Sequence, residues 1–186
     1  MKQGKEEFIP DTEVVYMRRI GQYGAENYAL MAKMKSWAAE RGILTEETVI
    51  YGIALDNPQN VAPEKCRYDI CLHTPNIKNV ETDNQVARRV IMSGKYVVFK
   101  IEHTAKAVAD FWTSFPTDMA KSEYKMDFSR PIMEKYSIVM VKYGLQLANG
   151  ATMSEWCISC PCFMFLAISH CRPPINIIIK SKGTLV

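Results

Sequence analysis

Four cysteines late in the chain have residue types and spacing that could bind a metal. Cys157 and Cys160 form a Cys-x-x-Cys pair, and Cys162 and Cys171 follow it. Structural zinc needs four ligands, usually in two closely spaced pairs, and the further candidate in this segment is His170. The pattern is incomplete, so we predict ordinary thiols and no metal site.

No catalytic constellation follows from the other residue types. The three histidines are widely spaced, and no pattern of Ser, Asp or Cys sets a nucleophile beside a base. Gly21, Gly24 and Gly42 do not have the spacing of a phosphate-binding loop. We therefore expect no cofactor.

The charge distribution argues against direct binding of nucleic acid. The 186 residues include 23 Lys and Arg and 20 Asp and Glu, and three of the basic residues follow position 161, so residues 1–161 are neutral. Non-specific affinity for nucleic acid comes mainly from Lys and Arg that neutralise phosphates, and no basic stripe is evident. The composition, 48% hydrophobic and 23% charged, is typical of a folded globular protein.

The sequence also favours a cytoplasmic protein. The polar start, Met1–Glu7, does not have the apolar stretch of a secretory leader. Uncharged segments fall short of the ~20 apolar residues that span a bilayer, so no membrane partner is expected. In the cytoplasm the six cysteines would be reduced, and we predict no disulfide framework.

The first half of the chain predicts one strand, one helix and two further strands. Residues 13–20 are rich in β-formers, and residues 25–41 repeat apolar side chains at helical spacing until Gly42 ends the helix. Residues 48–55 and 66–73 are strand-like. In residues 66–73 the side chains alternate between two sets, as in an antiparallel strand with one face exposed to solvent.

The second half repeats this order. Residues 86–92 and 95–101 are strand-like around Ser93-Gly94, which predicts a two-residue hairpin. Thr104 is the expected cap of a helix that Pro116 should end. Another strand is expected near Pro131. Two such β-α-β-β units can bury their apolar faces by sharing one antiparallel sheet with both helices on one face, which predicts an α+β fold.

Two separated motifs make the sequence more specific. The first is Tyr51-Gly-Ile-Ala-Leu-Asp-Asn-Pro58 with Pro63-Glu-Lys-Cys-Arg-Tyr-Asp-Ile70, and the second is Ser122-Glu-Tyr124 with Arg130-Pro-Ile-Met-Glu-Lys-Tyr136. They resemble the motifs of gyrase-inhibitor-like domains, which also serve as the effector-binding domains of AraC-type regulators. The resemblance covers residues 12–136, and residues 16–23 are similar to the family's opening strand.

The resemblance implies a duplicated β-α-β-β fold with a ligand groove between the repeats. In multidrug-sensing members a buried glutamate among aromatic side chains meets the positive charge of the ligand, and this role carries over to Glu134. From the residues alone, a glutamate on an alternating strand would be solvated. A carboxylate among aromatic rings instead gains by accepting a cation.

Seven aromatic residues accompany Glu134 as expected ligand-binding residues, although a place in the core is the ordinary role of an aromatic side chain on a strand or helix. They are Tyr16, Trp37, Tyr51, Phe99, Trp112, Tyr124 and Tyr136.

The resulting hypothesis is a sensor or sequestering domain for small cationic or aromatic amphipathic molecules, similar to a free-standing member encoded on a mobile gene cassette. About a dozen residues precede the first expected strand, so we expect no helix-turn-helix there and action through a separate DNA-binding regulator. Two alternatives stay open: a small hydrolase with Glu134 as general base, and an antagonist that binds gyrase.

The end of the chain departs from the family pattern. Trp156-Cys-Ile-Ser-Cys-Pro161 is a partial and late match to the strand that normally closes the domain. We therefore expect one domain over residues 1–161, with repeats at about 12–75 and 86–161. Residues 162–186 are expected to form an atypical tail that contributes little to the core.

Overall fold

The computed structural model describes residues 4–101, 104–122, 124–127, 129–137, 162–169, 175–176 and 178–179. Two helices, two short 3₁₀ helices and eleven strands occur in this part of the chain. In chain order they are β1 (Lys5–Ile9), β2 (Thr12–Ile20), α1 (Ala25–Glu40), β3 (Val49–Ala54), η1 (Pro63–Lys65), β4 (Arg67–His73), η2 (Ile77–Asn79), β5 (Ala87–Ile91), β6 (Gly94–Lys100), α2 (Ala105–Ala120), β7 (Lys125–Met126), β8 (Ile132–Ser137), β9 (Cys162–Ser169), β10 (Ile175–Asn176) and β11 (Ile178–Ile179).

The sheet is built from two matching halves. The first half contributes β2, β4 and β3 side by side, and the second contributes β6, β9 and β8. Antiparallel pairing of β3 with β8 joins the halves over six positions. The predicted duplication, the α+β class and the shared antiparallel sheet are confirmed, while the short strands β10 and β11 add parallel pairs with β6 and β8.

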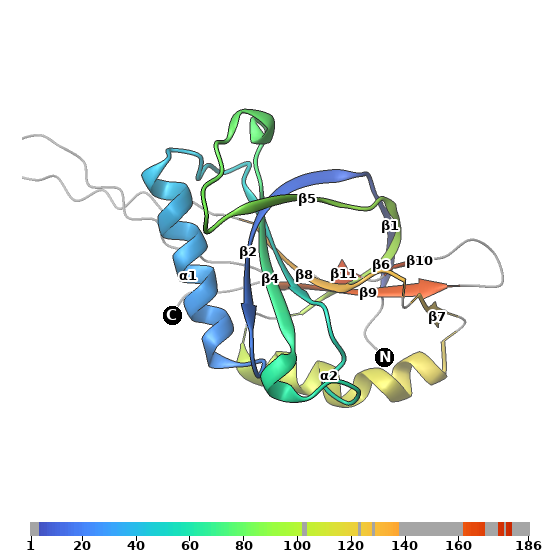
Figure 1. Cartoon of the computed structure of the whole chain (residues 1–186). Coiled ribbons are helices and arrows are strands. Elements are labelled where there is room, and N and C mark those ends of the chain that lie inside the picture. Colours follow the sequence, from blue (N-terminus) through green and yellow to red (C-terminus); the bar gives the residue numbers. More distant parts are fainter. Residues whose placement is uncertain are drawn as a thin grey trace, which may run out of the picture.

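The predicted hairpin at Ser93-Gly94 is wrong, because β5 and β6 pair with different strands. β5 pairs with β2, and β6 pairs with β1. The two pairings continue in the same register, because Thr12 lies opposite Ile91 and Ile9 lies opposite Gly94. The chain bends between β1 and β2 and, opposite this, between β5 and β6. At the bend the Ser93 N–H donates to the Asp11 carboxylate at 2.6 Å. This bent ladder connects the two ends of the sheet and curls it into a barrel-like ring, visible where β5 and β1 arch over the other strands (Figure 1).

Apolar side chains fill both faces of the curled sheet. The enclosed face holds one cluster, which includes Val14, Tyr51, Ile53, Tyr96, Val98 and Met133. On the other face, α1 packs through Met34 and Trp37 against β2, β3 and β4. The second helix packs through Phe111 and Phe115 against Val97 and Phe99 of β6.

Both helices lie on the same face of the sheet, as predicted. Tyr136 packs against the α1 cluster and Ile132 packs against the α2 cluster. These residues are four positions apart on β8, so their side chains point to the same side of the strand. Figure 1 shows the two helices on the outside of the curled sheet.

Two of the three helix termini for which the sequence gives a capping or stop residue lie where it predicts them. Gly42 ends α1 with φ of 64°, in the left-handed region that favours glycine. Thr104 caps α2, since its hydroxyl accepts from the Ala107 N–H at 3.1 Å. The expectation that Pro116 ends α2 is wrong, because the helix continues to Ala120. Burial of Phe115 and contact of Met119 with the same cluster offset the lost N–H of the proline.

The expectation that the segment after residue 161 is peripheral also needs correction. β9 lies between β6 and β8, where it pairs with both strands. It holds in the second half the place that β4 holds in the first, so it closes the sheet.

In the described part of the chain, neither helix is long and apolar enough to cross a membrane.

Candidate functional site

Glu134 lies at the centre of the sheet, on the strand where the two halves meet. Its Oε2 atom accepts two hydrogen bonds from tyrosine hydroxyls: one from Tyr136 at 2.6 Å and one from Tyr68 at 3.1 Å. Tyr136 belongs to β8, whereas Tyr68 reaches over from β4. Among the residues that the structure describes, no Lys, Arg or His forms a salt bridge with Glu134.

The space for this contact comes from Gly52 on β3, which lies directly opposite Glu134. A Cβ atom at position 52 would collide with the Tyr68 hydroxyl and would lie 3.2 Å from Glu134 Oε2. A glycine on the middle strand therefore lets side chains from the two flanking strands, β4 and β8, meet across it.

The surroundings of Glu134 favour its neutral form when no cation is present. Burial raises the pKa of Glu134, and the hydrogen bonds from Tyr136 and Tyr68 only partly oppose this by lowering it. A carboxylate that is costly to hold charged gains from a cation that restores the pairing.

Tyr68 is held in place by its own contacts. It is buried, and its ring centroid lies 5.9 Å from that of Tyr23. The Tyr23 hydroxyl lies 2.9 Å from the carbonyl oxygens of both Asp56 and Arg67, and it accepts from the Asp56 N–H at 3.1 Å. These backbone contacts fix the ring that supports Tyr68.

Glu134 lies between the two helix-covered clusters, because it is the middle one of Ile132, Glu134 and Tyr136 on one side of β8. Trp37 lies in the α1 cluster, where its Nε1–H donates to Asp83 at 2.9 Å. This indole is 5% exposed and contributes to the core. Of the predicted aromatic residues, Tyr136 contacts Glu134 directly.

Three other predicted aromatic residues lie on the α2 side. Phe99 packs against Phe111, with ring centroids 5.5 Å apart. Trp112 packs edge-on to Phe111 and is 38% exposed. The Tyr124 hydroxyl donates to Glu6 at 3.2 Å. All three therefore lie in or beside the cluster that α2 covers.

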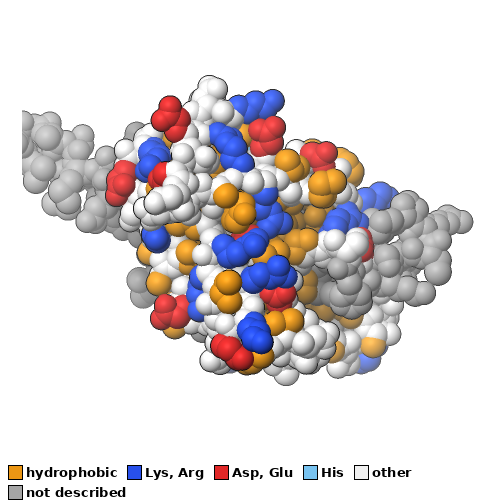
Figure 2. All heavy atoms as spheres, viewed as in Figure 1, with side chains coloured by type: hydrophobic (Ala, Val, Ile, Leu, Met, Phe, Trp, Pro, Cys, Tyr) orange, Lys and Arg blue, Asp and Glu red, His pale blue; other side chains and the backbone are white. Residues whose placement is uncertain are grey.

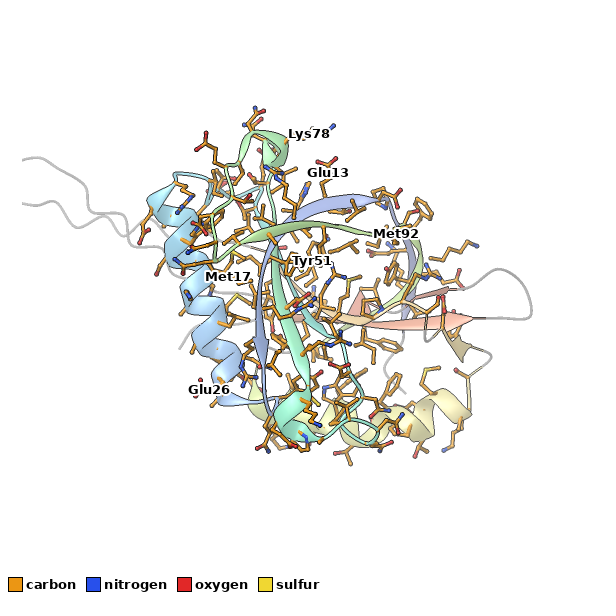
Figure 3. All side chains as sticks on the ribbon, viewed as in Figure 1. Glu13, Met17, Glu26, Tyr51, Lys78 and Met92 are labelled. Carbon is orange, nitrogen blue, oxygen red and sulfur yellow. The ribbon has the colours of Figure 1, made fainter. Side chains whose placement is uncertain are left out.

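Tyr16 and Tyr51 lie on the opposite face of the sheet from Glu134. Tyr51 neighbours Gly52 on β3, and successive strand residues point to opposite faces. Tyr16 and Tyr51 both pair with Cys71, so they share the enclosed face. Figure 3 shows Tyr51 among the strands, and Met17, next to Tyr16, lies toward α1.

The sequence analysis did not single out Tyr68 and Gly52 as site residues. Both lie within the first family motif, which was the signal that could have identified them. Their role depends on pairing between β4, β3 and β8, which the spacing along the chain does not reveal.

The structure describes no group of His, Cys, Asp and Glu that could hold a metal ion. Cys157, Cys160 and Cys171 lie outside the described residues. Cys66 and Cys71 are buried free thiols, and burial raises the pKa of the Cys71 thiol.

A comparison with known protein families finds a match over most of the chain. The model of the GyrI-like small molecule binding domain matches residues 4–140. The chain belongs to this family. The match includes both motifs and the whole Glu134 site, and it ends before β9.

Three relatives place the family in context. YosT of Bacillus subtilis (strain 168), described as a candidate transcriptional regulator from prophage SPbeta, is 35% identical over 136 residues, which are 73% of this chain and 89% of YosT. The C-terminal domain of EcmrR has a TM-score of 0.56 at 11% identity, covering 90% of this chain and 98% of that domain. SAV2435 bound to tetraphenylphosphonium has a TM-score of 0.50 at 15% identity, covering 90% and 94%.

The structure of EcmrR in its DNA complex contains more than this domain. The similarity there has a TM-score of 0.55 at 13% identity, and this chain spans about half, 54%, of that EcmrR chain. The similarity shows that this chain shares the fold of the C-terminal domain of EcmrR.

Proposed function

We propose that this domain binds small amphipathic cations that carry aromatic groups, with Glu134 as the counter-charge. The observation that carries the proposal is a partly buried carboxylate whose described partners are two tyrosine hydroxyls and no cation. A bound cation would supply the missing positive charge, and tyrosine rings beside the carboxylate would stack on its aromatic groups.

The family and one protein of similar fold support this ligand class. The family binds small molecules, and SAV2435 was solved with tetraphenylphosphonium, a permanently charged cation with four phenyl rings. In this chain the site lies between two apolar clusters, which suits a ligand with apolar groups on either side of its charge. The domain would act as a sensor or a sequestering protein, in the manner of regulator effector domains.

Titration calorimetry with two probes of similar shape tests the proposal. Tetraphenylphosphonium carries the charge, and triphenylphosphine oxide is a neutral aromatic control. Glu134→Gln keeps the side-chain shape and should cost the cation about 2–4 kcal/mol of binding free energy, as for one partner lost from a buried charge pair. Binding of the neutral probe should change little, because ring stacking does not need the carboxylate.

A matched variant controls for a general change in charge. Glu26→Gln removes one carboxylate from an exposed position on α1 (Figure 3) and should leave both affinities unchanged. Equal losses for both probes in Glu134→Gln would show that Glu134 supports the structure rather than the ligand. Turnover of an added aryl ester by the wild type but not by Glu134→Gln would instead support the hydrolase alternative.

A further inference from the structure

A second charged group lies on the face of the sheet opposite Glu134. The Asp69 carboxylate is fully buried and accepts hydrogen bonds from two arginines. Arg18 binds it with two nitrogen atoms, at 2.7 and 2.9 Å, and Arg89 binds it with Nη1 at 2.6 Å. We refer to Arg18, Asp69 and Arg89 as the arginine pair site.

The arginine pair site carries one uncompensated positive charge. Two guanidinium groups share the single carboxylate of Asp69. The neighbouring pair on this face, Arg67 and Asp56, is balanced, because Arg67 binds Asp56 through two side-chain nitrogens at 2.7 and 2.9 Å. Figure 2 shows Lys and Arg side chains across the middle of the molecule in this view, beside apolar side chains.

Both arginines keep donors free. Arg18 uses Nε and Nη2 on Asp69, and Arg89 uses only Nη1. Within the described part of the chain, the other guanidinium nitrogens of these two residues have no acceptor. A guanidinium is a rigid fork that suits carboxylate and phosphate oxygens, so these donors are available to an oxyanion.

An apolar platform lies next to the free donors. The guanidinium carbons of Arg18 and Arg89 lie 5.4 and 5.8 Å from the ring centroid of Tyr16. Exposure rises along this face of β2, from 1% at Val14 to 63% at Ile20. The arginine pair site therefore lies where the enclosed face opens to solvent, and the side chains of both arginines are still partly exposed, at 36% and 25%.

We propose that the arginine pair site binds a small oxyanion, a carboxylate or phosphate that bears an apolar or aromatic group. The oxyanion would accept the free N–H donors of Arg18 and Arg89, and its apolar part would lie against Tyr16 and Ile20. Asp69 holds both guanidinium groups in place, so the donors are positioned before the ligand arrives. This site is separate from the Glu134 site, because the two lie on opposite faces of the sheet.

Calorimetric titration with benzoate, inorganic phosphate and benzamide tests the proposal on the full chain. Benzoate should bind more tightly than phosphate, because it adds contact with Tyr16, and neutral benzamide should not bind. Arg89→Gln should weaken benzoate about tenfold or more, since charged hydrogen bonds are lost. Binding of phosphate equal to or stronger than benzoate would assign the site to inorganic anions and would overturn the role of the apolar platform.

Two controls keep the outcome distinct from the proposed function. Arg41→Gln removes the same charge from a side chain of similar exposure, 35%, at the C-terminal cap of α1, and should leave benzoate binding unchanged. Arg89→Gln should keep tetraphenylphosphonium binding, and Glu134→Gln should keep benzoate binding. Equal losses in Arg89→Gln and Arg41→Gln, or no binding of benzoate to the wild type, would overturn the proposal.

Wild-type protein gives an independent measurement if Arg89→Gln does not fold. The arginine Nε–H resonances of Arg18 and Arg89 should shift when benzoate is added, whereas the resonance of Arg41 should not. Shifts of similar size at all three arginines would show non-specific ion binding and would overturn the proposal.

Discussion

Gly52 on β3 provides the space in which the Tyr68 hydroxyl lies, because a Cβ atom at position 52 would collide with it. The hydroxyl is thereby able to donate to Glu134, which lies opposite Gly52 on β8. Three neighbouring strands thus contribute to this contact: β3 leaves the space, β4 supplies the donor Tyr68, and β8 supplies the acceptor Glu134.

Replacing Gly52 by Ala should therefore destabilise the domain by about 1–3 kcal/mol, as expected when a buried hydrogen bond to an acidic side chain is lost. Urea denaturation measures the change. In a Tyr68→Phe background the hydroxyl is absent, so Gly52→Ala should cost less there. Equal costs in both backgrounds would mean that the hydroxyl is not what the new methyl group displaces.

Binding of a permanently charged cation should weaken as the pH falls through the pKa of Glu134. Burial raises this pKa above the usual carboxyl value, and the proton removes the counter-charge. Titrations of tetraphenylphosphonium across a pH series should show this fall in the wild type and none in Glu134→Gln. In Tyr68→Phe the fall should begin at higher pH, because the lost hydrogen bond was lowering the pKa.

Stability should respond to pH in the opposite direction to binding. With a raised pKa in the folded state, folded protein holds the Glu134 proton more tightly than unfolded protein does. The contribution of Glu134 to stability is therefore present below the unfolded pKa and is lost as the pH rises through the folded pKa. The difference in unfolding free energy between the wild type and Glu134→Gln, measured against pH, should follow this course; a difference that does not vary with pH would contradict it.

Removing the segment after residue 161 should destabilise the domain by about 3 kcal/mol or more. The truncation removes β9, which pairs with β6 at four positions and with β8 at two. Each lost backbone hydrogen bond costs about 0.5–1.5 kcal/mol. Thermal unfolding of this truncation should be compared with that of a shorter one, after residue 179, which keeps β9, β10 and β11. An unchanged melting temperature in the protein that ends at residue 161 would show that β9 does not support the sheet.

Replacing Pro116 by Ala should stabilise the domain by about 1–3 kcal/mol. Proline inside a helix lacks an N–H and is disfavoured relative to alanine, and α2 continues past this position. Thermal and urea unfolding measure the gain. Pro63→Ala is the matched control and should give no gain, because Pro63 is the first residue of η1, where the N–H has no role. A loss of stability in Pro116→Ala would show that the packing of α2 depends on the proline.

The sequence alone determined the local elements and pointed to the central residue of the candidate site. Alternating residues predict β4, apolar residues at helical spacing predict α1, and Gly42 and Thr104 mark helix termini, because each signal depends on neighbours within a few positions. The two motifs were sufficient to identify the family and to single out Glu134 as the candidate ligand-binding residue.

Long-range pairing decided the rest. Tyr68 and Gly52 meet Glu134 only because β4, β3 and β8 are adjacent, and no local signal reports which strands will be neighbours. The bend that separates β5 from β6, and the place of β9 between β6 and β8, depend in the same way on closure of the sheet. Pro116 stays within α2 because the buried face of the helix outweighs a local penalty, and that burial exists only in the folded domain.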